Sequence, residues 1–87
     1  MKGANLFLVN LRNYLRVDFL SVIADNMKAS PDIYRTMQDC FNLCLWRCWG
    51  SVEVLIDLHP ERKEIYTFPA VFKIFNEAFN LACSDLA

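Results

Sequence analysis

Only two glycines and three prolines interrupt this chain of 87 residues, so the segments between the breaks are long. Residues 5–26 contain neither glycine nor proline, and apolar residues at positions 8, 11, 15, 19, 22 and 23 recur at the spacing of one helical face. This pattern predicts a helix over residues 5–26. The apolar run at residues 6–11 is also compatible with a strand, and that alternative stays open.

Ser30, Pro31 and Asp32 predict the start of a second helix. The Ser30 hydroxyl can accept the N-cap hydrogen bond, Pro31 suits the first helical position, and Asp32 complements the positive end of the helix dipole. We expect this helix to run to about Trp49, because Gly50 is a favourable residue directly after a helix end.

The residues after Gly50 change period. Val52, Val54, Ile56 and Leu58 occupy every second position, which is typical of a strand. A turn at residues 59–63 and a β-prone run at residues 64–68 complete the pattern of a β-hairpin. A short helix through residues 52–58 is the alternative. Pro69 then opens a last helix, whose predicted core face is formed by Val71, Ile74, Phe75, Ala78, Phe79 and Ala82.

These elements predict a single domain, residues 1–87, of the helix-dominated α+β class: two helices, a β-hairpin and a C-terminal helix. An all-α bundle of four elements is the alternative. Hydrophobic residues make up 55% of the chain, whereas a chain this short buries only about 60–65% of the surface that its unfolded form exposes. The apolar surplus predicts a face covered by another protein or by a second copy, with a tightly packed monomer as the alternative.

Cys40, Cys44 and Cys48 recur every four residues in the second predicted helix. Cys40 and Cys48 are about 12 Å apart along a helix axis, which is too far for one zinc ion to bind all three thiolates. The three positions drift by only about 40° per step, so we expect buried thiols that act as small core spacers. A zinc or thiol redox site that combines two of them with Cys83 and His59 is a third functional hypothesis.

The opposite arc of that helix mixes large apolar and charged residues, and the last helix has an apolar arc wider than one core face needs. Trp and Arg contribute most to protein-binding hot spots. We therefore predict a protein interface that contains Arg35, Asp39, Leu43, Trp46, Arg47, Phe72 and Leu81. The alternative for Trp46 is that it covers a neighbouring element of its own chain.

Nine Lys and Arg balance ten Asp and Glu, and the two signs are interspersed. Nucleic-acid binding normally needs a basic stripe, so this balance disfavours it. Arg12 and Arg16, one helical turn apart, are the phosphate-binding candidates of an alternative function, a small helical DNA-binding transcriptional regulator. The sequence has no signal-peptide pattern, and its apolar runs are much shorter than the roughly 18 residues that a membrane span requires. We therefore expect a cytoplasmic protein that does not bind membranes.

His59 is the single histidine, and the two glycines preclude most phosphate-binding loops. The sequence therefore predicts no catalytic residue, no cofactor and no metal ligand. The function that it favours is a non-enzymatic protein-interaction module, a small regulator, inhibitor or immunity-type protein. Such a module acts as a homodimer, by occupying the surface of another protein, or both.

Overall fold

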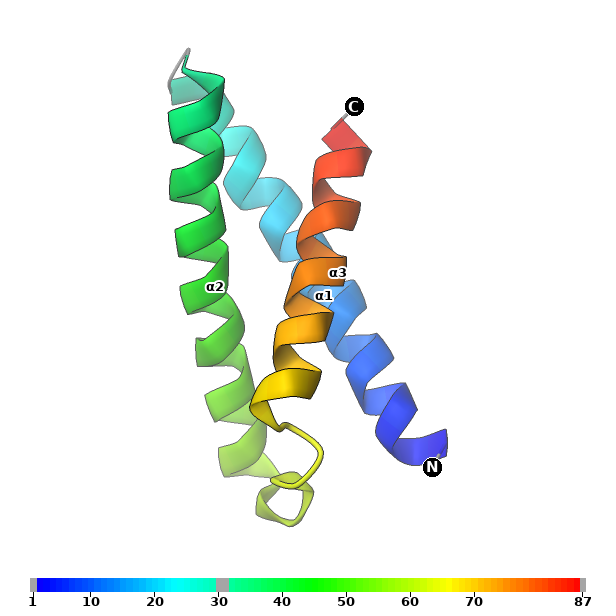
Figure 1. The fold of residues 1–87 in the computed structure, drawn as a ribbon. Helices are drawn as coiled ribbons and strands as arrows, with labels where there is room; N and C mark the ends of the chain where they lie inside the picture. Colours follow the sequence, from blue (N-terminus) through cyan, green and yellow to red (C-terminus); the bar gives the residue numbers. More distant parts are fainter. Residues whose placement is uncertain (1, 30–31, 87) are drawn as a thin grey trace.

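A computed structural model describes residues 2–29 and 32–86 of the chain. Its elements are α1 (Lys2–Ala29), α2 (Ile33–Leu58), the short 3-10 helix η1 (Pro60–Arg62) and α3 (Phe68–Leu86). Helices α1 and α2 run antiparallel, and α3 crosses over α1, on which it packs more extensively than on α2 (Figure 1). The result is an elongated molecule of 44 × 21 × 18 Å.

Buried residues recur every four positions on the two long helices. They are Leu11, Leu15, Phe19 and Ile23 on α1, and Thr36, Cys40, Cys44, Cys48 and Val52 on α2. A row of side chains four residues apart forms a ridge that is inclined to the helix axis, so helices that pack through such ridges cross at an angle. They therefore diverge away from the crossing, as α1 and α2 do toward the start of α1 (Figure 1).

The predicted burial of the cysteine row is confirmed, since Cys40, Cys44 and Cys48 are each 0% exposed. They share one core cluster with large aromatic rings. The rings of Phe19 and Phe75 meet edge to face at 5.6 Å. Because protein cores are close-packed, small thiols on α2 leave the volume that the rings of α1 and α3 fill.

The predicted β-hairpin is wrong, and the all-α alternative fits. The described residues contain no strand, and residues 52–58 continue α2. Val52 is buried as the next member of the four-residue row after Cys44 and Cys48, so packing outweighs the strand preference of the valines. Residues 64–68 form a turn and the first residue of α3, and residues 6–11 are helical.

The predicted helix end at Gly50 is also wrong, because Gly50 lies inside α2 and does not have a positive φ. The helix ends at Leu58, since Pro60 has no N–H to donate and disfavours a helical conformation for His59. At the other end, the predicted cap residues Ser30 and Pro31 lie outside the described residues. Asp32 is the N-cap, and its carboxylate accepts a hydrogen bond of 3.1 Å from the backbone N–H of Arg35.

The last helix agrees with its sequence pattern. Pro69 lies in the first turn of α3, and the carbonyl of Thr67 accepts a hydrogen bond of 2.9 Å from the N–H of Val71. Five of the six predicted core residues are buried, and Phe79 is half-buried against the same cluster.

Replacing Cys44 by Arg tests the cysteine row. We expect Cys44→Arg to abolish cooperative folding, because it places an unpaired charge at a fully buried position. Thermal unfolding followed by circular dichroism measures this. Asn42→Arg, at an exposed position of the same helix, is the matched control and should unfold like the parent protein. A cooperative transition of unchanged midpoint for Cys44→Arg would contradict this packing.

Gly50→Ala tests the continuous α2 helix. No atom lies within 4 Å of the Cβ that this change adds. Alanine should therefore raise the free energy of unfolding by about 0.5–1 kcal/mol through its higher helix propensity. Urea denaturation measures the gain, and a loss of stability would indicate that Gly50 ends the helix after all.

Candidate protein-interaction surface

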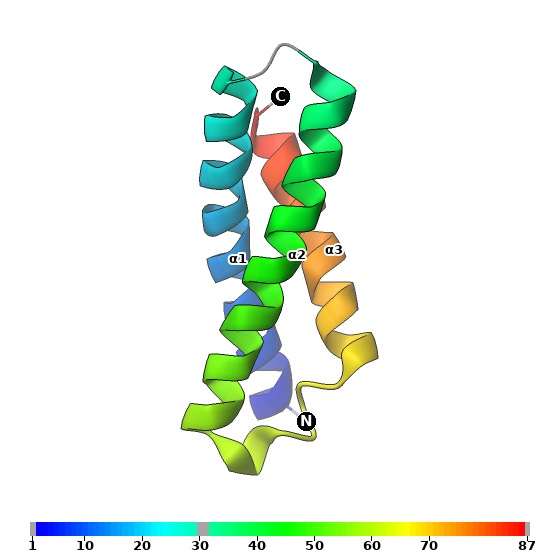
Figure 2. The same ribbon diagram turned by 90° about the vertical axis from the view of Figure 1, so that its left-hand side faces the viewer.

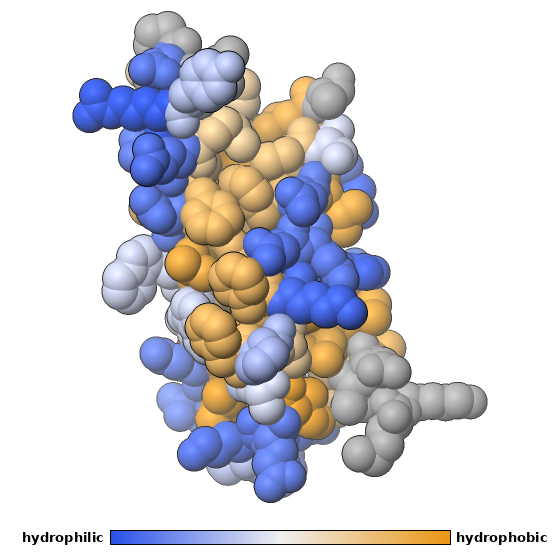
Figure 3. Space-filling model, in the orientation of Figure 1, coloured by the Kyte–Doolittle hydropathy of each residue, from blue (hydrophilic) through white to orange (hydrophobic). Residues whose placement is uncertain are grey.

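Five large apolar side chains form a continuous surface across α2 and α3, which we call the apolar band: Leu43, Trp46, Trp49, Phe68 and Phe72. The three members on α2 are three residues apart, so each neighbours the next on the helix surface. The indole of Trp49 stacks on the ring of Phe68 at 5.7 Å, and Phe68 stacks on Phe72 at 5.8 Å. Figure 3 shows apolar side chains running down this face, over the seam between α2 and α3.

The band is exposed but rests on the core. Trp46 is 79% exposed and Phe68 is 63% exposed. The ring of Phe72 lies 6.1 Å from that of the fully buried Phe75, which also contacts Phe41 of α2 at 5.0 Å. Single apolar residues on a surface are ordinary, whereas a contiguous set marks a binding surface. Aromatic rings held by the core lose little further freedom on binding.

The structure brings five of the seven predicted interface residues into one region. Arg35, Asp39 and Leu43 are four residues apart and Trp46 follows three residues later, so they form one exposed row. All four residues are exposed, and α2 is the helix that lies in front of α1 and α3 in Figure 2. Trp49 and Phe68, which stack on one another, connect Phe72 to this row.

Arg47 lies apart from this row and points toward α1. Its Nε donates a hydrogen bond of 2.6 Å to Oδ2 of Asp18, and a second guanidinium N–H donates to Oδ1. This bidentate hydrogen bonding raises the pKa of Arg47. The side chain is still half-exposed, but its charge is matched within the chain.

Leu81 is half-buried on the side of α3 that faces α1, because the residues four positions before and after it, Glu77 and Asp85, both meet arginines of α1. Arg16 donates two hydrogen bonds of 2.7 Å to the Asp85 carboxylate, which holds the pKa of Asp85 below its usual value. Arg12 lies 3.6 Å from Glu77. The two arginines considered for phosphate binding are thus both directed at carboxylates of α3.

Sequence reasoning missed Trp49 and Phe68 as surface residues. Residues 64–68 were predicted to form a β-prone run, whereas Phe68 is the exposed first residue of α3, and Trp49 is half-buried. The spacing of three residues between Trp46 and Trp49 was the available signal. Their connection to α3 depends on how the two helices are placed.

The four cysteines are free thiols, and burial raises the pKa of each one. The pKa of Cys44 is raised to about 12 and that of Cys48 to about 11. A thiol must lose its proton to act as a nucleophile, so burial disfavours thiolate chemistry at these cysteines near neutral pH. The described residues contain no group of three or more His, Cys, Asp and Glu side chains arranged for a metal ion.

The raised thiol pKa values make stability pH-dependent on the alkaline side. Unfolded cysteines ionise near pH 8.5–9, whereas folded Cys44 and Cys48 stay neutral until about 12 and 11. The folded state should therefore lose stability as the pH rises above about 9, and the urea midpoint should fall between pH 8 and pH 10.5. A Cys44→Ala, Cys48→Ala variant is the control, since its fall should be smaller; an equal fall would contradict this cause.

Comparison with known proteins adds no family to this description. No family model matches the chain, and no curated protein or solved structure matches it. No helix in the described part of the chain has both the length and the apolar character to cross a membrane. The apolar band, with its packing on the core, is thus the feature from which a function is proposed.

Proposed function

We propose that this chain is a non-enzymatic protein-interaction module that binds its partner through the apolar band. The observation that carries the proposal is the 79% exposure of Trp46 beside exposed Leu43, on a helix side that no other described element covers. Tryptophan is the residue type most enriched in binding hot spots. Its full burial by a partner removes a large apolar area from water.

The surroundings of the band support the same proposal. Protein interfaces combine an apolar centre with a polar rim. Trp46 and Phe68 supply such a centre, and exposed Arg35 and Asp39 extend the row at one end. The band spans two helices that are joined through the core contact of Phe41 with Phe75.

The mode of action belongs to the same proposal. A chain of this size with such a surface acts by occupying the surface of another protein, as small regulators, inhibitors and immunity-type proteins do, or by pairing with a second copy of itself. Four free thiols favour the cytoplasm as the place of action, because exported small proteins tend to pair their cysteines.

Trp46→Ala tests the proposal. The interacting protein is first identified by affinity purification, and its 1:1 binding to the purified chain is then measured by calorimetry; a self-pairing chain is measured by sedimentation equilibrium. We expect Trp46→Ala to weaken either association by roughly 30-fold or more, which is the loss typical of a hot spot. Because the side chain is exposed, the urea midpoint should hardly change.

Tyr34→Ala is the matched control, since Tyr34 lies on the same helix, is 90% exposed and is not part of the band. It should leave both association and stability unchanged. Equal binding by the Trp46 variant and the parent protein, or equal losses in the two variants, would contradict the proposal. A loss of stability that matched the loss of binding would mean that Trp46 supports the fold instead.

A further inference from the structure

A groove with a cavity volume of about 710 Å³ runs between the first half of α1 and the second half of α2. It lies on the side of α2 that faces α1, whereas the apolar band continues onto α3. It extends from Arg47 of α2 to His59, the residue after the helix end, and 12 residues at the rise of a helix correspond to about 18 Å. Its volume is within the range of small-molecule sites in proteins, roughly 300–1,000 Å³. The groove exists because α1 and α2 diverge toward this end of the molecule.

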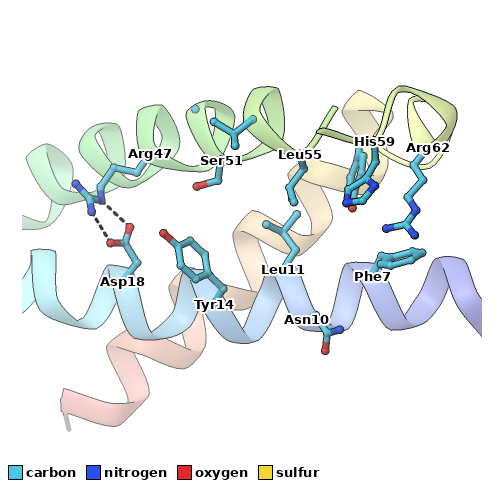
Figure 4. Close-up of a pocket in the computed structure, with 13 residues that line it drawn as sticks. Phe7, Asn10, Leu11, Tyr14, Asp18, Arg47, Ser51, Leu55, His59 and Arg62 are labelled. Atoms are coloured by element: carbon cyan, nitrogen blue, oxygen red, sulfur yellow. Dashed lines mark hydrogen bonds and ion pairs between the residues drawn. The ribbon is translucent and has the colours of Figure 1, made fainter. Parts of the chain in front are cut away.

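The middle of the groove is apolar. Leu11 of α1 and Leu55 of α2 point toward one another across it (Figure 4). Tyr14 and Val54, which are 59% and 56% exposed, form its rims. Gly50 contributes no side chain to the α2 wall, and the space above it is open. An extended apolar molecule can therefore lie against the α2 backbone at this point.

The two ends of the groove differ in charge. At one end, the bidentate hydrogen bonds between Arg47 and Asp18 neutralise both side chains (Figure 4). At the other end, the guanidinium carbon of Arg62 lies 3.5 Å from the centre of the Phe7 ring. A cation–π contact of this kind holds the guanidinium through its flat face. The N–H groups lie in the plane of the guanidinium, so the ring contact does not use them as donors.

Arg62 lacks a hydrogen-bonded carboxylate within the described part of the chain. Its side chain is only 28% exposed, and its Nε lies 3.8 Å from Oε1 of Glu61, beyond hydrogen-bond distance. The same oxygen lies 3.4 Å from Nδ1 of His59, and the Glu61 side chain is 65% exposed. The ion pair with the exposed Glu61 leaves the guanidinium N–H groups of Arg62 without a hydrogen-bonded carboxylate, so they can donate to an anion at this end of the groove.

We propose that the groove binds a single-chain carboxylate amphiphile. The hydrocarbon chain lies along Leu11 and Leu55 and passes over Gly50, and the carboxylate accepts hydrogen bonds from the guanidinium of Arg62. This site is separate from the apolar band, so it neither requires nor excludes the interaction proposed above. The combination of an apolar groove with a guanidinium at its end that donates no hydrogen bond to a carboxylate of the described residues selects this ligand class over neutral and cationic amphiphiles.

Calorimetric titration with decanoate, at concentrations that do not form micelles, tests the site on the whole chain. We expect saturable 1:1 binding with unchanged far-UV circular dichroism. Decan-1-ol should bind at least about tenfold more weakly, because it lacks the charge-assisted hydrogen bonds. Lengthening the carboxylate by two carbons should tighten binding by about 15-fold if both added CH2 groups are buried. Decyltrimethylammonium should show no saturable binding; equal affinity for all three head groups would overturn the proposal.

Variants distinguish the head-group contact at Arg62 from the apolar part of the groove. Arg62→Gln should lower the affinity for decanoate to that for decan-1-ol and leave decan-1-ol binding unchanged, whereas Arg35→Gln, at the far end of α2, should change neither. If Arg62→Gln weakens both ligands equally, the residue only shapes the groove and the carboxylate assignment is wrong. Gly50→Leu should block both ligands without loss of helix, because its side chain projects into the groove.

A second variant in the groove wall tests the same point if Gly50→Leu fails to fold. Val54→Glu places a charge on an exposed part of the groove wall beside the hydrocarbon chain and should weaken decanoate at least about tenfold, because the chain would cover the charged group. If Gly50→Leu or Val54→Glu folds and binds decanoate as the parent protein does, the ligand lies elsewhere and the proposal is overturned. Neither outcome bears on Trp46, so failure of this site is distinct from failure of the interaction proposal.

Discussion

The row of buried side chains every four residues along α1 and α2 is the constraint on which the rest of the structure depends. Cys40, Cys44 and Cys48 continue into Val52, so the contact line winds around α2 instead of following its axis. Small thiols on this line leave volume for the rings of Phe19 and Phe75, which close the core between the three helices. The cysteines act here through their size and burial, and the same burial raises their pKa values and disfavours thiolate chemistry near neutral pH.

Both surfaces to which we assign binding follow from this inclined packing. Helices that cross at an angle cannot cover each other along their whole length. On one side of α2 the divergence from α1 leaves the groove that ends at Arg62. On the other side, α3 approaches α2 through stacked rings and leaves Trp49, Phe68 and Phe72 as the continuation of the exposed Trp46. Helix α2 is the wall that the two surfaces share.

Charged side chains fix how the helices sit on one another. Arg16 with Asp85 and Arg47 with Asp18 form bidentate pairs from α1 to α3 and from α1 to α2. Exposed ion pairs of this kind contribute only about 0–1 kcal/mol each, so they favour one alignment more than they stabilise the fold. Arg62 differs because an aromatic ring holds it and no carboxylate within the described residues accepts a hydrogen bond from it.

The sequence alone determined the features that depend on local periodicity. The apolar spacing predicted the helix over residues 5–26, the core face of the last helix and the burial of the cysteine row, and it placed Leu43 and Trp46 on the opposite side of their helix. Tertiary packing decided the rest. Valines at every second position fit a strand as well as a helix, and it is the packing of α2 that buries Val52 and selects the helix. Gly50 is compatible with a helix end, but here packing stabilises the helix beyond it. Likewise, only the crossing of the helices joins Phe72 to Trp46 and turns Arg47 and Leu81 toward α1, because the spacing along one helix does not specify which other helix lies against each of its faces.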